Sequence, residues 1–154
     1  MFEETQARYK TNKEIEIIRL KQVKVDKTDW ASVMDRNQLG RKIIDEIGNN
    51  SQEVVVIVGF NAKNEIKFLS KVFVGGSRSA LSEPRPIFQR LLLNGCTSFV
   101  MAHNHPSGNL SPSDKDIDFV KRLKKCEKIL GIKLLDSLIV TEYAYSSMAE
   151  RKLL

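Results

Sequence analysis

The chain has 154 residues and a net charge of +6, with 42% hydrophobic and 29% charged residues. This length favours one domain with its own core, and no apolar run approaches the roughly 20 residues that a membrane span needs. The N-terminus lacks the apolar segment of a secretory signal, and two cysteines are too few for a disulfide framework. We therefore expect a cytoplasmic protein with buried, free thiols at Cys96 and Cys126.

The N-terminal part begins with a polar stretch of mixed charge, residues 1–13, which we expect to form an arm. A single domain is expected over residues 14–154. Residues 14–25 alternate between apolar and polar side chains, which predicts a strand. Ser32 or Asp35 should cap a helix that ends at Gly48. The apolar face of this helix contains Leu39, Ile43, Ile44 and Ile47.

Two strands of a hairpin are predicted in the middle of the chain. Glu53–Phe60 is a continuous apolar run after its first residue, which is typical of a central strand covered on both faces. Residues 65–74 alternate as its partner across a short turn. After a loop over residues 77–86, proline favours the first turn of a helix that runs to about Asn94. Its apolar residues are Ile87, Phe88, Leu91 and Leu92.

The last third of the chain adds further strands and one helix. Thr97–Ala102 is an apolar run that predicts a buried strand, and residues 113–130 predict a helix. Two short strands are expected over residues 132–135 and 137–141, before a closing hairpin. Interleaved strands and helices indicate the α/β class, a single domain with a mixed β-sheet flanked by helices. The buried face of the helix should contain Ile117, Val120, Leu123 and Ile129.

Both histidines of the chain lie where the predicted strand Thr97–Ala102 ends, in the sequence HNHPSG. Side chains two residues apart on a strand point the same way, so His103 and His105 should present two imidazoles side by side. Asp116, in the first turn of the next helix, is a candidate third ligand. Two imidazoles and one carboxylate suit a zinc ion whose fourth position is left to water.

Other interpretations of this segment stay open. Ser113 and Asp116 have the spacing of a helix cap, and a capping residue can also bind a metal. The histidines could be hydrogen-bonded polar residues, or chance members of a loop rich in proline, glycine and serine. Two histidines on one face of a strand end favour the metal site.

The basic charge allows a nucleic-acid partner; the lysines are spread along the chain, and the densest cluster of cations lies on the helix after the histidines. No aromatic residue is interleaved with these cations, as a stacking platform for single strands would need. A solvated helix face is the favoured interpretation. The cations are Lys121, Arg122, Lys124, Lys125 and Lys128.

The HNHPSG segment, followed by Ser113 and Asp116, resembles the RadC family of the JAB/MPN group, whose zinc metallopeptidase-like domains share an HxHP…SxxD (JAMM) motif. The resemblance covers roughly residues 35–154. It implies a three-layer, cytidine-deaminase-like architecture, and Zn²⁺ held by His103, His105 and Asp116. Ser113 matches the serine that helps to stabilise the tetrahedral intermediate, and Glu53 matches the acid/base glutamate at the start of an upstream strand.

The chain departs from the longer RadC proteins in lacking room, before residue 14, for their N-terminal helix-hairpin-helix region, so it resembles a short form. Pro86 stands where the family usually has an acidic residue. Two functions follow as hypotheses. The first is a zinc-dependent metallopeptidase or isopeptidase-like hydrolase acting on a peptide or isopeptide. The alternative is a non-catalytic, DNA-repair-associated or DNA-binding accessory protein; the sequence does not indicate the oligomeric state.

Overall fold

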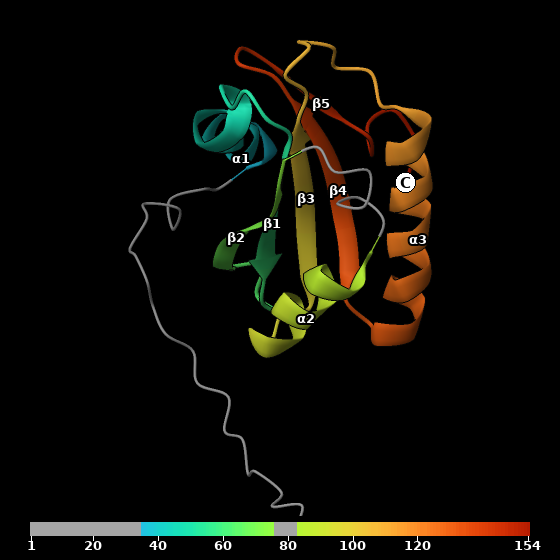
Figure 1. Ribbon diagram of the computed structural model, residues 1–154. Helices are drawn as coiled ribbons and strands as arrows, with labels where there is room; N and C mark the ends of the chain where they lie inside the picture. Colours follow the sequence, from blue (N-terminus) through green and yellow to red (C-terminus); the bar gives the residue numbers. More distant parts are fainter. Residues whose placement is uncertain (1–34, 76–82) are drawn as a thin grey trace, which may run out of the picture.

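The strand that carries the first histidine, β3, lies at the centre of a five-stranded sheet of order β2-β1-β3-β4-β5 (Figure 1). The computed structural model describes residues 35–75 and 83–154. β1 pairs antiparallel with both β2 and β3, β4 runs parallel to β3, and β5 pairs antiparallel with β4, so the sheet is mixed, as predicted. The strands are β1 (Val54–Phe60), β2 (Ile66–Val74), β3 (Ser98–Asn104), β4 (Lys133–Val140) and β5 (Tyr145–Ser147).

Helices cover both faces of the sheet. They are α1 (Arg36–Ile43), continued by the π-helical turn η1 (Ile44–Gly48), then α2 (Arg85–Leu93) and α3 (Asp114–Leu130). Asp35 caps α1 by accepting a hydrogen bond from the Gln38 amide at 2.8 Å. Of the two capping residues that the sequence allowed, Ser32 and Asp35, the helix therefore uses Asp35. Pro84 is the N-cap of α2 and Pro86 lies in its first turn, and Gly131 ends α3 in the left-handed conformation, as the helix signals predicted.

Strand alternation divides the core into two clusters, one on each face of the sheet. Val54, Val56 and Val58 of β1 pack with α1 and η1, whereas Val55 and Ile57 pack with α2 and α3. All of β1 and all of β3 are buried, which confirms two strands covered on both faces. The domain therefore has three layers, in agreement with the predicted α/β class.

The two short strands predicted over residues 132–135 and 137–141 are one strand, β4. The expected break at Asp136 is wrong, because its buried carboxylate is satisfied within the domain. It accepts hydrogen bonds from the Ser147 hydroxyl at 2.6 Å and from the amides of Ser137 and Ala149 at 2.7 and 3.0 Å. The chain accommodates Leu135 as a register shift against β3.

Two predicted burials, those of Ile129 and Cys126, are also wrong. Ile129 is 83% exposed, because it lies six residues after the buried Leu123 and so roughly 240° around the helix from it. Leu92, one of the apolar residues expected on α2, is 56% exposed, since its neighbour Leu91 faces the core. Cys126 is only partly buried, whereas Cys96 is buried; both thiols are free, as expected.

Several expectations lie outside the described residues: the arm over residues 1–13, the strand over residues 14–25, Ser32, and the loop up to residue 82. Within the part of the chain that is described, no helix is long and apolar enough to cross a membrane.

Gly59 interrupts the valine- and isoleucine-rich strand β1 because the side chains of Phe68 and Cys96 occupy the space where its Cβ would lie. A Cβ at Gly59 would overlap the ring of Phe68 and lie 2.6 Å from Sγ of Cys96. We expect Gly59→Ala to lower the free energy of unfolding by about 1–3 kcal/mol, the usual cost of overpacking a core. Urea denaturation measures the loss. Adding Cys96→Ala should recover part of it, and strictly additive losses would contradict this account.

Candidate metal centre

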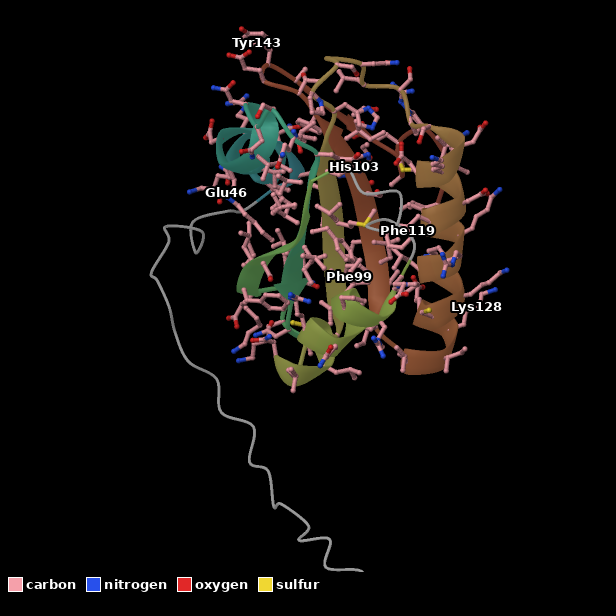
Figure 2. The ribbon with its side chains drawn as sticks, viewed as in Figure 1. Glu46, Phe99, His103, Phe119, Lys128 and Tyr143 are labelled. Carbon is pink, nitrogen blue, oxygen red and sulfur yellow. The ribbon has the colours of Figure 1, made fainter. Side chains whose placement is uncertain are left out.

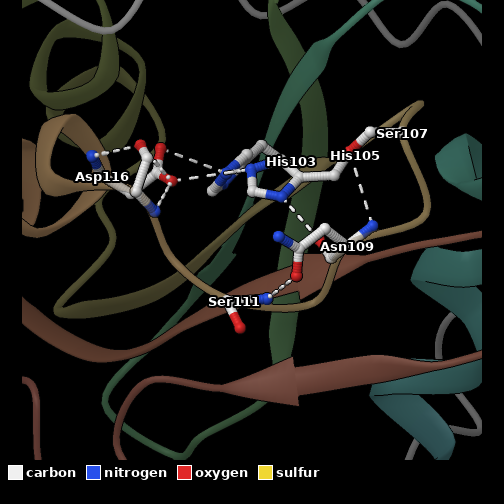
Figure 3. Close-up of polar contacts among 7 residues, drawn as sticks. His103, His105, Ser107, Asn109, Ser111 and Asp116 are labelled. Carbon is white, nitrogen blue, oxygen red and sulfur yellow. Dashed lines mark hydrogen bonds and ion pairs between the residues drawn. The ribbon is translucent and has the colours of Figure 1, made fainter.

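The structure brings both histidines and Asp116 together at one end of the central strand. His103 belongs to β3 and His105 follows its last residue, and their Nε2 atoms lie 3.0 Å apart (Figure 3). Nε2 of His103 lies 3.3 Å from Oδ1 of Asp116, and Nε2 of His105 lies 3.5 Å from Oδ2. The expectation that residues two apart on a strand share a face is therefore confirmed.

The loop after β3 fixes the orientation of His105. Its amide donates to the Val140 carbonyl of β4 at 2.9 Å, which extends the sheet contact by one residue. Gly108, with φ +78°, then turns the chain, in a conformation that side chains rarely adopt. This turn brings the Asn109 carbonyl to 2.7 Å from Nδ1 of His105. A proton held on Nδ1 by this bond leaves the lone pair of Nε2 for a metal.

Asp116 is held by the N-terminus of its own helix. The Ser113 amide and hydroxyl both lie 2.7 Å from Oδ2 of Asp116, and the Asp116 amide donates back to the Ser113 hydroxyl oxygen at 3.2 Å. This is a capping box with an aspartate in the third helical position. The two interpretations that the sequence left open are thus compatible, because Oδ1 stays directed at His103 while Oδ2 completes the cap.

The donor set fits a divalent transition metal. The candidate ligand atoms of the three residues all lie within 4.8 Å of one another. Bonds of about 2.0–2.1 Å in a tetrahedral site place neighbouring ligands roughly 3.3–3.4 Å apart. The separations of 3.0, 3.3 and 3.5 Å bracket that value. Nδ1 of His103 is buried and has no hydrogen-bond partner among the described residues, so His105 alone has the usual support behind its ring.

The electrostatics of the site couple its members. A hydrogen bond to Asp116 raises the pKa of His105 above its ordinary value of 6.5; burial opposes the rise, and the Asn109 carbonyl and the charges of Asp116 and Glu53 add to it. Burial acts to raise the pKa of Asp116, but hydrogen bonds from His103 and His105 hold it well below its ordinary range. Asp116 is therefore an anion at neutral pH, as a metal ligand must be.

Glu53 lies beside this site, although its carboxylate has no hydrogen bond or ion pair among the described residues. In the antiparallel pairing of β1 with β3, Val55 lies opposite His103 and Val56 opposite Ala102. Extending this register by two residues places Glu53 opposite His105. The negative charge of Glu53 contributes to the raised pKa of His105, which is consistent with that placement. The catalytic roles of Glu53 and Ser113 stay predictions, and the Ser113 hydroxyl is engaged with Asp116 in this structure.

Asn104, between the two histidines, is a residue that the sequence analysis missed. It is fully buried, and its side chain points to the opposite face from the imidazoles. Its Oδ1 accepts from the Val54 amide at 2.6 Å, and its Nδ2 donates to the carbonyls of Asn50 and Gln52 at 3.0 and 3.1 Å. These bonds hold the residues on both sides of Glu53. A buried asparagine inside an apolar strand was the available signal, because such an amide needs partners.

The fold and this site define the class of protein, a mixed α/β domain with a candidate His–His–Asp metal centre at the end of its central strand. Residues 33–153 match the RadC-like JAB domain, and the chain belongs to this family. The resemblance stated from the motif is thereby confirmed.

Curated relatives share this domain and carry the name UPF0758 protein. The protein of Clostridium perfringens strain 13 is 34% identical over 134 residues, which cover 87% of this chain and 59% of the relative. The protein of Carboxydothermus hydrogenoformans is 44% identical over 108 residues, 70% of this chain and 48% of the relative. The protein of Geobacillus kaustophilus is 39% identical over 101 residues, which cover 66% of this chain and 45% of the relative. The chain thus spans about half the length of the curated relatives it matches.

Metal binding should weaken as the pH falls. Protons compete with a metal for His105, and its raised pKa means that the competition begins above pH 6.5. Once the pH is below the pKa of His105, the apparent Kd for Zn²⁺, used as the probe, should rise by up to about tenfold per pH unit. Calorimetric titrations between about pH 8 and pH 5.5 measure this. Glu53→Gln should move the loss of zinc affinity to lower pH, because the variant lacks a negative charge that favours protonation of His105. A Kd that does not change with pH would contradict the assignment of His105 as a metal ligand.

Asn104 can be tested separately from the ligands. We expect Asn104→Leu to lower the free energy of unfolding by about 2–4 kcal/mol, because it leaves buried groups of the preceding loop unpaired. Urea denaturation measures this loss. Asn49→Leu, at an exposed asparagine in the same connection, is the control and should change stability little. Equal losses in both variants would show that the hydrogen bonds of Asn104 are not responsible.

Proposed function

We propose that this chain is a zinc-dependent hydrolase that cleaves amide bonds in peptides or isopeptides. The observation that supports the proposal most is the cluster of His103, His105 and Asp116, and the electrostatic interaction of Glu53 with His105 is consistent with a role for this glutamate beside it. Two neutral imidazoles and one carboxylate with room for water are typical of catalytic zinc sites.

His103, His105 and Asp116 would hold the ion. When bound, zinc supplies a Lewis acid that acidifies water and polarises a carbonyl group. The anionic Asp116 offsets part of the positive charge, and the Asn109 carbonyl keeps the His105 ring in a fixed orientation.

The remaining chemistry is proton transfer, and we assign it to Glu53. The carboxylate accepts the proton that water loses as it adds to the substrate carbonyl, and returns it to the leaving nitrogen. The bonds of Asn104 to the residues on both sides of Glu53 keep that part of the backbone in place. Ser113 would donate to the oxyanion, for which its hydroxyl must exchange the bond to Asp116.

The alternative, a DNA-associated accessory protein, also stays a proposal. Two of the cations on α3 have carboxylate partners, Lys121 with Asp118 and Lys124 with Glu127. Steeply salt-dependent DNA binding that weakens when Lys124 and Lys125 lose their charge would support this function.

The metal is tested first, by elemental analysis of the untagged full chain after zinc loading and desalting. We expect about one zinc per chain in the wild type, and its loss in His105→Ala and Asp116→Asn. Asp114→Asn removes an exposed carboxylate from the same helical turn and should keep the metal. Zinc retained by Asp116→Asn would remove this residue from the ligand set, and absence of zinc from the wild type would end the proposal.

Glu53→Gln separates metal binding from turnover. The variant should keep zinc and lose about 10²–10⁴-fold in hydrolysis rate, the usual contribution of a general base. The assay uses internally quenched peptides and ε-linked lysyl isopeptides with the zinc-loaded full chain. Glu142→Gln, which changes an exposed glutamate in the turn between β4 and β5, should be as active as the wild type. Undiminished hydrolysis by Glu53→Gln would contradict the assigned role.

A further inference from the structure

A groove lies between α2 and α3, at the end of β3 that is remote from the candidate metal centre. Its volume is about 1060 Å³, at the upper limit for small-molecule sites and large enough for several residues of a peptide. Phe88 lines it and packs edge-on against Phe99, with ring centroids 5.6 Å apart. Phe99 precedes His103 by four strand residues, roughly 13 Å along β3 (Figure 2). The groove is therefore separate from the metal ligands.

The lining residues follow one stripe along each helix. Phe88 and Leu92 of α2 are four residues apart, as are Arg122, Cys126 and Leu130 of α3. Residues at this spacing lie on the same side of a helix. The groove therefore runs along both helices rather than across their ends, which suits an elongated ligand.

Three cationic residues line the groove, Arg85 of α2 and Arg122 and Lys125 of α3. Among the described residues, the side chains of Arg85, Arg122 and Lys125 have no hydrogen bond or ion pair, and no carboxylate lines the groove. Lys121 and Lys124, which do not line it, lie 3.7 and 2.7 Å from Asp118 and Glu127. The groove thus has three cationic side chains and no carboxylate to offset their charge, and this favours an anionic ligand.

The apolar part of the groove narrows the choice of ligand. Leu92 and Leu130 are 56% and 42% exposed, so aliphatic side chains beside the cations remain available to a partner. The aromatic lining residue, Phe88, is 3% exposed and offers no stacking surface for a base. Carboxylates combined with aliphatic side chains match both features better than a nucleic acid does.

We propose that the groove between α2 and α3 binds an acidic, aliphatic peptide segment of a partner protein. Arg85, Arg122 and Lys125 pair with its carboxylates, and Leu92 and Leu130 contact its aliphatic side chains. Binding needs neither the metal nor Glu53, so it can succeed or fail independently of the hydrolase function.

The test is direct binding of a fluorescein-labelled nine-residue peptide in which two leucines, four positions apart, lie among glutamates. Fluorescence anisotropy with the full chain should give saturable binding. Arg122→Glu/Lys125→Glu should weaken it at least about tenfold, as expected for loss of two charge-assisted contacts. Lys121→Glu/Lys128→Glu makes the same change in net charge on the same helix outside the lining, and should weaken binding less than about threefold. Leu92→Ser should weaken binding, whereas Tyr143→Ser, at the far end of the molecule, should not (Figure 2).

Cys126 gives a second readout, because it lines the groove and is only partly buried. Its reaction with a maleimide should slow when the peptide saturates the protein. Cys96 interferes little, since burial raises the pKa of its thiol. Equal loss of binding in the two charge-reversed variants, or an unchanged labelling rate, would overturn the proposal. Tighter binding of a thymidine oligonucleotide or of anionic phospholipid vesicles through Arg122 and Lys125 would also overturn it, in favour of that ligand.

Discussion

The antiparallel pairing of β1 with β3 is the constraint on which the candidate site depends. It sets Val55 opposite His103, and the same register extended by two residues would set Glu53 opposite His105. Because strand side chains alternate, a shift of one residue in this register would turn Glu53 to the other face of the sheet. The burial of both strands on both faces fixes the register, since any slip would exchange one packed cluster for the other.

Alternation also gives the segment from His103 to His105 two separate tasks. The imidazoles face Asp116 on one side of the sheet. On the other side, the side-chain amide of Asn104 forms hydrogen bonds with the backbone before and at the start of β1. Asp116 combines tasks in a similar way, because one oxygen closes the helix cap with Ser113 and the other faces His103. The site is therefore stiff for local reasons: each candidate ligand residue, or its immediate neighbour, also holds backbone structure.

Much of this could be predicted from the sequence, because the signals were local. The period of the strands, the caps at Asp35 and Ser113, and the spacing of the two histidines each depend on few residues. The errors arose where tertiary contacts decide. Asp136 appeared to break a strand because its hydrogen-bond partners, Ser147 and Ala149, lie 11 and 13 residues away in the sequence, too far for a local pattern to reveal them.

The same limit explains the other omissions. Whether Leu92 is buried depends on what lies beside α2, which helical periodicity does not contain. The contacts of Asn104 required the pairing of β1 with β3, and the groove required the placement of α2 beside α3, neither of which a pattern of apolar residues specifies.

The candidate ligands are close together in the sequence, between positions 103 and 116, whereas Glu53 reaches them only through the sheet. Closing the short segment around an ion costs little chain entropy, and β3, its loop and the start of α3 are sufficient to do it. Opening of β1 away from β3 would remove Glu53 and leave His103, His105 and Asp116 assembled. If the site acts as proposed, partial unfolding would separate metal binding from proton transfer by Glu53, and metal content alone would overstate the native fraction of a preparation.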